Sequence, residues 1–145
     1  MKRSFAGALL FLLVLSAGQG GYGENAKGAP DLAVSPSKHD FGVLGVPLES
    51  KTRVFTISNT GAAALVVSGI VLSDTANYSL DMNTGPDPCG SVTPRIAPGG
   101  HCTFAVTFYP QSQGILDASI TVLSNDPDTP RMSVPLKGFG LLCYC

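Results

Sequence analysis

The chain has 145 residues, of which 44% are hydrophobic and 13% charged, and its formal net charge is −1. This length and composition suit one compact domain with a real core, and the absence of a basic cluster argues against nucleic acid as a partner. Seventeen Gly and eleven Pro are spread among many short apolar runs. No long amphipathic helical pattern competes with these runs, so the composition predicts an all-β protein rich in turns.

Residues 1–23 have the pattern of a secretory signal peptide. Lys2 and Arg3 precede an uninterrupted apolar run, Phe5 to Leu15, and small residues follow it. The run is shorter than the roughly 20 apolar residues of a membrane-spanning helix, so a retained anchor is the weaker alternative. We expect cleavage between Gly18 and Gly23 and a mature protein without a stable membrane span.

The expected destination is the periplasm, the cell surface or the medium. Removing a leader that carries Lys2 and Arg3 lowers the formal net charge by two, to −3. The Gly-rich segment 24–30 is then expected to be a flexible N-terminal tail.

Short apolar runs separated by turn residues fill the domain expected at 31–140. In chain order they predict strands at 32–34, continued after Pro36 by 39–43, and at 51–59, 64–72, 77–80, weakly 92–96, 102–110, 114–122 and 132–136. The segment 64–72 is almost continuously apolar, which indicates either a central strand covered on both faces or an irregularity at Gly69. Gly138 and Gly140 are expected to end the last strand.

The clearest strand pattern lies between Cys102 and Pro110. One face of this segment carries Cys102, Phe104, Val106 and Phe108, and the other carries Thr103, Ala105, Thr107 and Tyr109. This alternation is typical of a half-buried core strand.

Seven to nine short strands, with turn signals about every ten residues, predict an antiparallel β-sandwich of the immunoglobulin type. A closed barrel is the alternative, which the low count and unequal lengths of the strands disfavour.

Six motifs, in their order along the chain, resemble those of ASH/Hydin-type immunoglobulin-like domains, a group often labelled choice-of-anchor D in bacteria. The motifs are His39–Gly42, Ser58–Gly61, Ala97–Cys102, Val106–Pro110, Ser124–Pro127 and Pro135–Gly140. The resemblance covers about residues 31–140. It implies a β-sandwich related to the major sperm protein and pilus-chaperone folds, acting as an interaction or spacer module. The chain departs from the family pattern in its single copy and in its ending, the segment 141–145, which contains no recognisable anchor.

Four cysteines allow three complete pairings. In an exported chain Cys89 and Cys102 flank a turn between adjacent strands, so we expect a structural disulfide there. No Cys-x-x-Cys motif indicates a redox role. Cys143 and Cys145 lie in the tail 141–145, where they could pair with each other, link two chains or bind a soft metal, and an inert tail is the default. Two thiolates alone make an incomplete zinc site.

The remaining candidates for chemistry do not form a site. His39 and His101 lie far apart, and the C-terminal Cys, His and Met cluster of a blue-copper site is absent. Asp126 and Asp128 lack the Gly and Glu of a calcium loop and are expected to be turn residues. The acceptor pattern at Asn77 matters only in a eukaryotic secretory pathway. No nucleophile motif, phosphate loop or paired carboxylates are present, so we predict no catalytic, cofactor or metal residues.

The sequence therefore predicts a non-enzymatic, exported Ig-like module with a structural or protein-interaction role. The first alternative is a pilus-chaperone-like assembly factor, although such proteins have two domains. If the leader is not used, a cytoskeletal or ciliary ASH protein is the second. A metal or electron carrier is least favoured. The sequence does not identify the protein partner, and it leaves open a dimer through Cys143 or Cys145.

Overall fold

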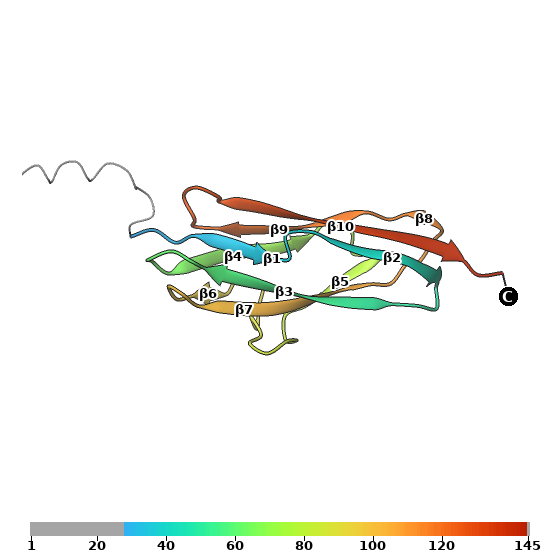
Figure 1. Ribbon diagram of the computed structural model, residues 1–145, viewed down its shortest axis with the longest axis horizontal. Helices are drawn as coiled ribbons and strands as arrows, with labels where there is room; N and C mark the ends of the chain where they lie inside the picture. The colour runs from blue at the N-terminus through green and yellow to red at the C-terminus, as the bar shows by residue number, and fades with distance from the viewer. Residues whose placement is uncertain (1–27, 145) are drawn as a thin grey trace, which may run out of the picture.

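A computed structural model describes residues 28–144, whose regular structure consists of β-strands in two facing layers (Figure 1). The four-stranded sheet has the order β1 (Leu32–Ser35), β3 (Lys51–Asn59), β7 (His101–Phe108) and β5 (Tyr78–Asp81). The six-stranded sheet has the order β2 (His39–Val46), β10 (Arg131–Leu142), β9 (Ala118–Ser124), β4 (Leu65–Leu72) and β6 (Arg95–Ile96), with β8 (Gly114–Ile115) beside β10. The predicted all-β sandwich is confirmed. The count exceeds the prediction because the first predicted strand divides into β1 and β2, and the strand predicted at 114–122 divides into β8 and β9.

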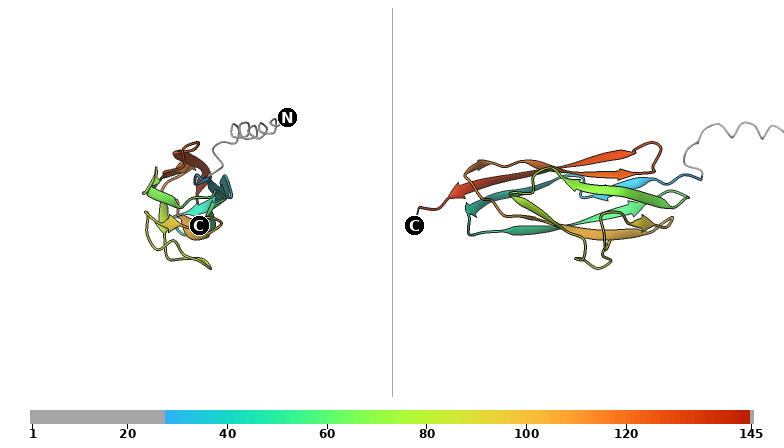
Figure 2. Two further views of the ribbon diagram at one scale, coloured as in Figure 1. Left: turned by 90° about the vertical axis from the view of Figure 1, so that its left-hand side faces the viewer. Right: turned by 180° about the vertical axis from the view of Figure 1, so that it is seen from behind.

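The core lies between the two sheets, which enclose it when the molecule is viewed along its long axis (Figure 2). Its centre contains four fully buried phenylalanine side chains: Phe41, Phe55, Phe104 and Phe108. Burial of each such ring contributes about 1.5–3 kcal/mol. The centre of β7 is covered on both faces, because Thr103 on its outer face is also buried. The half-buried strand predicted there is thus more enclosed than its alternation suggests.

The first predicted strand divides between the two sheets at Pro36. β1 pairs antiparallel with β3 in one sheet, whereas β2 pairs parallel with β10 in the other. Proline cannot donate a ladder hydrogen bond, so the ladder is interrupted where the chain crosses. The crossing therefore connects an edge strand of one sheet to an edge strand of the other. Because β2 and β10 are parallel, the sandwich is not purely antiparallel.

The apolar segment 64–72 forms a strand with an irregularity, the second of its two predicted alternatives. The register of β4 against β9 shifts between Val67 and Gly69. Val66 and Val71 point to solvent, with 37% and 52% of their surface exposed. β4 is therefore covered on one face only, and its apolar run does not mark a strand buried on both faces.

The last strand is longer than predicted. β10 continues to Leu142, two residues into the segment expected to be a tail. A Cβ atom on Gly138 would lie 2.5 Å from Cζ of Phe108, and one on Gly140 would lie 2.1 Å from the carbonyl oxygen of Ser112. These glycines permit close packing within the strand instead of ending it.

The predicted strand 114–122 is broken into β8 and β9. Gly114 has a φ of 122°, a conformation that side chains disfavour, and Leu116 N–H donates to the carbonyl of Gly138. The chain thus contacts β10 briefly before it turns into β9.

The signal peptide expected at 1–23 lies outside the described residues, as does most of the tail expected at 24–30. The carbonyl of Ala29 accepts hydrogen bonds from the N–H groups of Ala62 and Ala63. Fixed structure therefore begins before residue 31. Between residues 28 and 144, no helix has the length and apolar character needed to cross a membrane.

Candidate interaction surfaces

The loop that follows β5 is attached to the edge of β7 by backbone hydrogen bonds and a disulfide. Thr103 N–H donates to the carbonyl of Asp87 at 2.7 Å, and Cys89 N–H donates to the carbonyl of Thr103 at 2.8 Å. The sulfur atoms of Cys89 and Cys102 are 2.00 Å apart. This is the pairing that the sequence predicts. The segment 87–89, which we call the edge plug, covers the edge of β7 beyond the end of β5.

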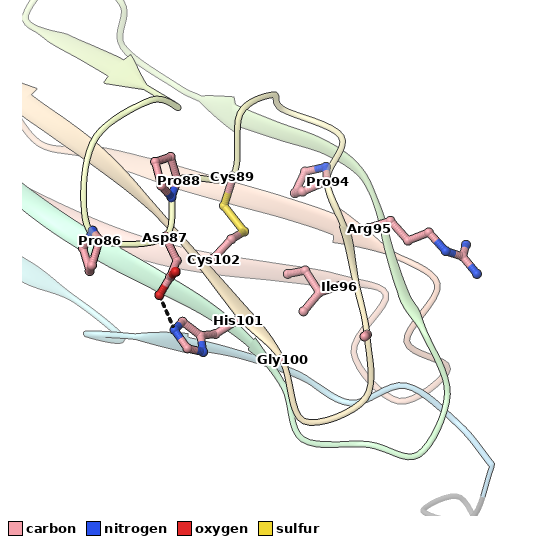
Figure 3. Close-up of a pocket in the computed structure, with 11 residues that line it drawn as sticks. Pro86, Asp87, Pro88, Cys89, Pro94, Arg95, Ile96, Gly100, His101 and Cys102 are labelled. Carbon is pink, nitrogen blue, oxygen red and sulfur yellow. Dashed lines mark hydrogen bonds and ion pairs between the residues drawn. A yellow bond between two sulfur atoms is a disulfide. The ribbon is translucent and has the colours of Figure 1, made fainter.

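A groove of about 550 Å³ lies beside the edge plug (Figure 3). The disulfide and three prolines, Pro86, Pro88 and Pro94, line it. Nε2 of His101 lies 3.0 Å from Oδ2 of Asp87. The side chain of Arg95 points away from the groove. An exposed ion pair of this kind contributes only about 0–1 kcal/mol. The groove is polar and open, and it contains no nucleophile with an adjacent base.

The two histidines have different surroundings. His101 contacts Asp87, whereas the ring of His39 packs edge-on against Phe41 at a centroid distance of 4.6 Å. Within the described part of the chain, no group of three or more His, Cys, Asp or Glu side chains could hold a metal ion.

Asp126 is a buried turn residue that connects the two sheets. Its Oδ2 accepts the N–H of Leu32 in β1 at 2.8 Å, and its Oδ1 accepts the N–H groups of Asp128 and Thr129. Burial disfavours the charged carboxylate, but these backbone donors together outweigh it, so the pKa of Asp126 lies below its usual value. The carboxylate is thus a turn residue, as the sequence predicts for this position.

Replacing Asp126 by Ala is expected to lower the free energy of unfolding by about 1–3 kcal/mol, because buried N–H groups lose their acceptor. Since the folded-state pKa lies below the unfolded value of about 3.9, the stabilisation is full above about pH 5 and is lost as the pH falls. Urea unfolding at pH 3 and pH 7 should show weaker acid destabilisation in Asp126→Asn than in the wild type. Exposed Asp117→Asn is the control, and equal effects of the two variants would contradict this role.

Asn77, in the predicted glycosylation pattern, has a structural role in this fold. Its Nδ2 donates to Asp74 at 2.8 Å, and its Oδ1 accepts the N–H of Gln111 at 2.8 Å. The next residue, Tyr78, donates its hydroxyl proton to the carbonyl of Leu116 at 2.7 Å, and burial raises its pKa well above the usual value.

The outer edge of β4 is unpaired beyond its contact with β6. The hydrogen bond from Ser73 N–H to the carbonyl of Ser119 continues the ladder between β4 and β9, so the backbone groups of Ser73 face β9. Backbone groups alternate in direction along a strand, so those of Ile70 and Leu72 face the free edge. An adjacent groove of about 440 Å³ is lined without any carboxylate or cation by Ile70, Val71, Leu72, Thr75, Tyr78, Ser79 and Leu80.

The opposite edge of the six-stranded sheet, at β2, is surrounded by positive charge. A hollow of about 430 Å³ is lined by Lys38, His39, Asp40, Pro135 and Lys137. From the facing sheet, Lys51 donates to the carbonyl of Phe41 at 3.4 Å. Burial lowers the pKa of His39, and Arg53 and Lys51 lower it further against the opposing effect of Asp40. We call Lys38, His39, Lys51, Arg53 and Lys137 the cationic surface.

At the end of the molecule that carries the C-terminus, β2 and β8 lie on either side of β10 (Figure 1). Val43 in β2 and Ile115 in β8 flank Phe139 in β10 at the same level of the sheet, and they are 60% and 75% exposed. Cys143 is an exposed free thiol close to Gly45, whereas Cys145 lies outside the described residues.

Sequence patterns did not reveal the cationic surface or the free edge of β4. The cations are spread over a hundred positions between Lys38 and Lys137, and only strand pairing brings them together. The absence of charge between Leu65 and Leu72 is a usable signal, but by itself it is equally compatible with a strand buried on both faces and with an irregular strand.

Comparison with known proteins gives the family. Residues 30–138 match the model of the HYDIN/CFA65/VesB-like, Ig-like domain. This chain belongs to the HYDIN/CFA65/VesB-like Ig-like domain family. The ASH/Hydin-type resemblance expected from the motifs is confirmed. No curated protein matches the sequence.

Solved structures share the fold of this HYDIN/CFA65/VesB-like domain at low sequence identity. A protein of unknown function from Porphyromonas gingivalis W83 has a TM-score of 0.62 at 21% identity, over 81% of this chain and 50% of that one. The Vibrio cholerae VesB protease has a TM-score of 0.57 at 20% identity, over 74% and 31%. The PapD-like domain 7 of human CEP192, an ASH/PapD-like domain, has a TM-score of 0.52 at 12% identity, over 85% and 92%.

This chain therefore spans half the length of the first of these proteins and about a third of the second. At such identities the likeness establishes the sandwich fold and nothing about activity.

Proposed function

We propose that this chain is an exported, non-enzymatic Ig-like module that binds a partner protein by accepting an extended strand at the free edge of β4. Three features support this proposal: a leader pattern at 1–23, a disulfide of the kind found in oxidising compartments, and an interior of apolar side chains. The observation that carries the mode of binding is the uncharged free edge beside the groove of about 440 Å³.

Edge strands are commonly protected against pairing by charged side chains. Such charges occur on β2 (Asp40), on the outer half of β3 (Lys51 and Arg53) and at the end of β5 (Asp81). β4 carries none. Its backbone groups at Ile70 and Leu72 can pair with an added strand, whose alternate apolar side chains would enter the groove.

The test is to place a photo-crosslinking amino acid at Val71 in the full chain, expressed in its native host. We expect this chain to be found in the exported fraction without residues 1–23. We also expect the crosslinker at Val71 to give one adduct with a partner protein. The same amino acid at Val54, an exposed valine of the other sheet, is the matched control. A Val71→Lys variant with the crosslinker at Thr75 should lose the adduct.

Retention of the unprocessed chain in the cytoplasm would contradict export. Equal adducts at Val71 and Val54, or an adduct that survives Val71→Lys, would contradict binding at β4. Because Val71 is outside the core, the Lys substitution should change stability by no more than about 0.5 kcal/mol.

A further inference from the structure

We propose that the cationic surface beside β2 binds an acidic, extended segment of a partner protein. It is a second surface, on the edge of the six-stranded sheet opposite β4. The inference rests on the proposed interaction role, but it concerns different residues, so the two proposals can fail separately.

The first support is the segregation of charge. Residues 28–144 contain six Lys and Arg side chains against nine carboxylates, so the described domain is acidic as a whole. Four of those six cations nevertheless belong to the cationic surface, and only Arg95 and Arg131 lie elsewhere. A local positive field on an acidic domain selects anionic partners and steers them to this edge.

The second support is that these cations are not neutralised within the domain. The ion pair that the described residues contain joins His101 to Asp87, so none of the carboxylates between residues 28 and 144 lies within 4.0 Å of the charged group of Lys38, Lys51, Arg53 or Lys137. Asp40, the one carboxylate lining the hollow, accepts the N–H of Gly42. An external carboxylate would relieve the repulsion among these like charges.

The third support identifies the ligand as a peptide. β2 pairs with β10 on one side only, so its other edge has backbone groups that no described strand pairs with, and near it the ammonium group of Lys51 donates to the carbonyl of Phe41 at 3.4 Å. Such edge groups can hydrogen-bond a polypeptide backbone. The register shift near Gly42, which has a φ of 82°, interrupts the edge and limits the pairing to a few residues. Charge therefore contributes more to binding than the strand ladder does.

The geometry indicates how such a segment would contact the protein. Successive side chains of an extended peptide point in opposite directions. At the edge of β2, one set would face Lys38 and Lys137, which line the hollow, and the other would face Lys51 and Arg53 of the other sheet. A run of acidic residues can thus contact both pairs of cations.

The probe is a synthetic nonapeptide of consecutive Glu residues, which presents carboxylates on both of its faces, with a nonapeptide of consecutive Lys residues as its control. We expect saturable binding to the full chain that weakens as salt rises. Amide resonances of residues 38–41 and 51–53 should shift in NMR spectra. Since peptide carboxylates favour the protonated imidazole, the pKa of His39, followed by its ring resonances, should rise on binding.

Matched charge-reversal variants separate this surface from general charge effects. The double variant Lys51→Glu/Arg53→Glu should weaken binding about tenfold or more. Lys38→Glu/Lys137→Glu should weaken it by a similar factor, although it leaves the hydrogen bond between Lys51 and the carbonyl of Phe41 intact. Arg95→Glu/Arg131→Glu changes the net charge equally and should leave the affinity within about twofold. Val71→Lys, at the β4 edge, should also leave it unchanged.

The proposal fails if the three double variants weaken binding equally, if the peptide does not bind, or if the pKa of His39 is unaffected at saturation. It also fails if inorganic polyphosphate or vesicles of anionic phospholipid bind the cationic surface more tightly than the peptide. Loss of peptide binding in Val71→Lys would place the peptide at β4 and overturn the assignment to β2.

Discussion

Replacing Phe108 by Ala is expected to lower the free energy of unfolding by about 3–5 kcal/mol. The Phe108 side chain is fully buried, and its ring centroid lies 4.7 Å from that of Tyr78 and 5.7 Å from that of Phe41. It also fills the space that Gly138 leaves open, so truncation removes contacts with both sheets at once. The strands around this ring are fixed by their ladders and cannot collapse into the cavity.

Urea unfolding followed by circular dichroism measures the effect of Phe108→Ala. Val54→Ala is the matched control, because Val54 is 36% exposed and its truncation should cost about 0.5 kcal/mol or less. Phe108→Leu should lose less stability than Phe108→Ala because it leaves a smaller cavity. Similar losses for Phe108→Ala and Val54→Ala would show that this face of β7 is not in the core.

Removing the disulfide with Cys89→Ala/Cys102→Ala is expected to cost about 3 kcal/mol, which for a domain of this size lowers Tm by about 10 °C. The bond joins residues 13 positions apart and holds the edge plug against β7. Its loss should release the hydrogen bond from Thr103 N–H to Asp87 before the rest of the sheet opens.

Calorimetry and hydrogen exchange measure the two effects together. Exchange at the amide of Thr103 should accelerate more than exchange at Phe55, in the middle of β3. Cys143→Ala serves as the control, because that free thiol is exposed and its loss should leave Tm unchanged. Mass spectrometry without reductant should find Cys89 linked to Cys102 in exported protein. Two free thiols there would contradict the link.

Several features of the fold could be read from neighbouring residues. The alternation between Cys102 and Phe108 identifies the central strand because side chains of a strand point alternately to opposite faces. Turn residues such as those at Ser124–Pro127 mark where strands end. The order of six such motifs also indicated the family. The pairing of Cys89 with Cys102 followed from two cysteines on either side of one turn.

Other features depend on contacts between distant parts of the chain. Gly138 looks like a strand end from its neighbours, but its role is set by Phe108, thirty residues away. The continuous apolar run of β4 is compatible with a strand buried on both faces and with a strand that has an irregularity at Gly69. Only its register against β9 and its place in the sheet distinguish these two alternatives.

The all-β class, the central strand and the disulfide follow from the sequence alone, because each rests on periodicity or spacing over about ten residues. The immunoglobulin-like family followed from the resemblance of six motifs in their order along the chain. Which strand edges remain open and where charge gathers depends on contacts between residues far apart in the sequence. The free edge of β4 and the cationic surface at β2 arise from the order and register of strands in the sheets. That order is set by the packing of the whole core, which no local pattern records.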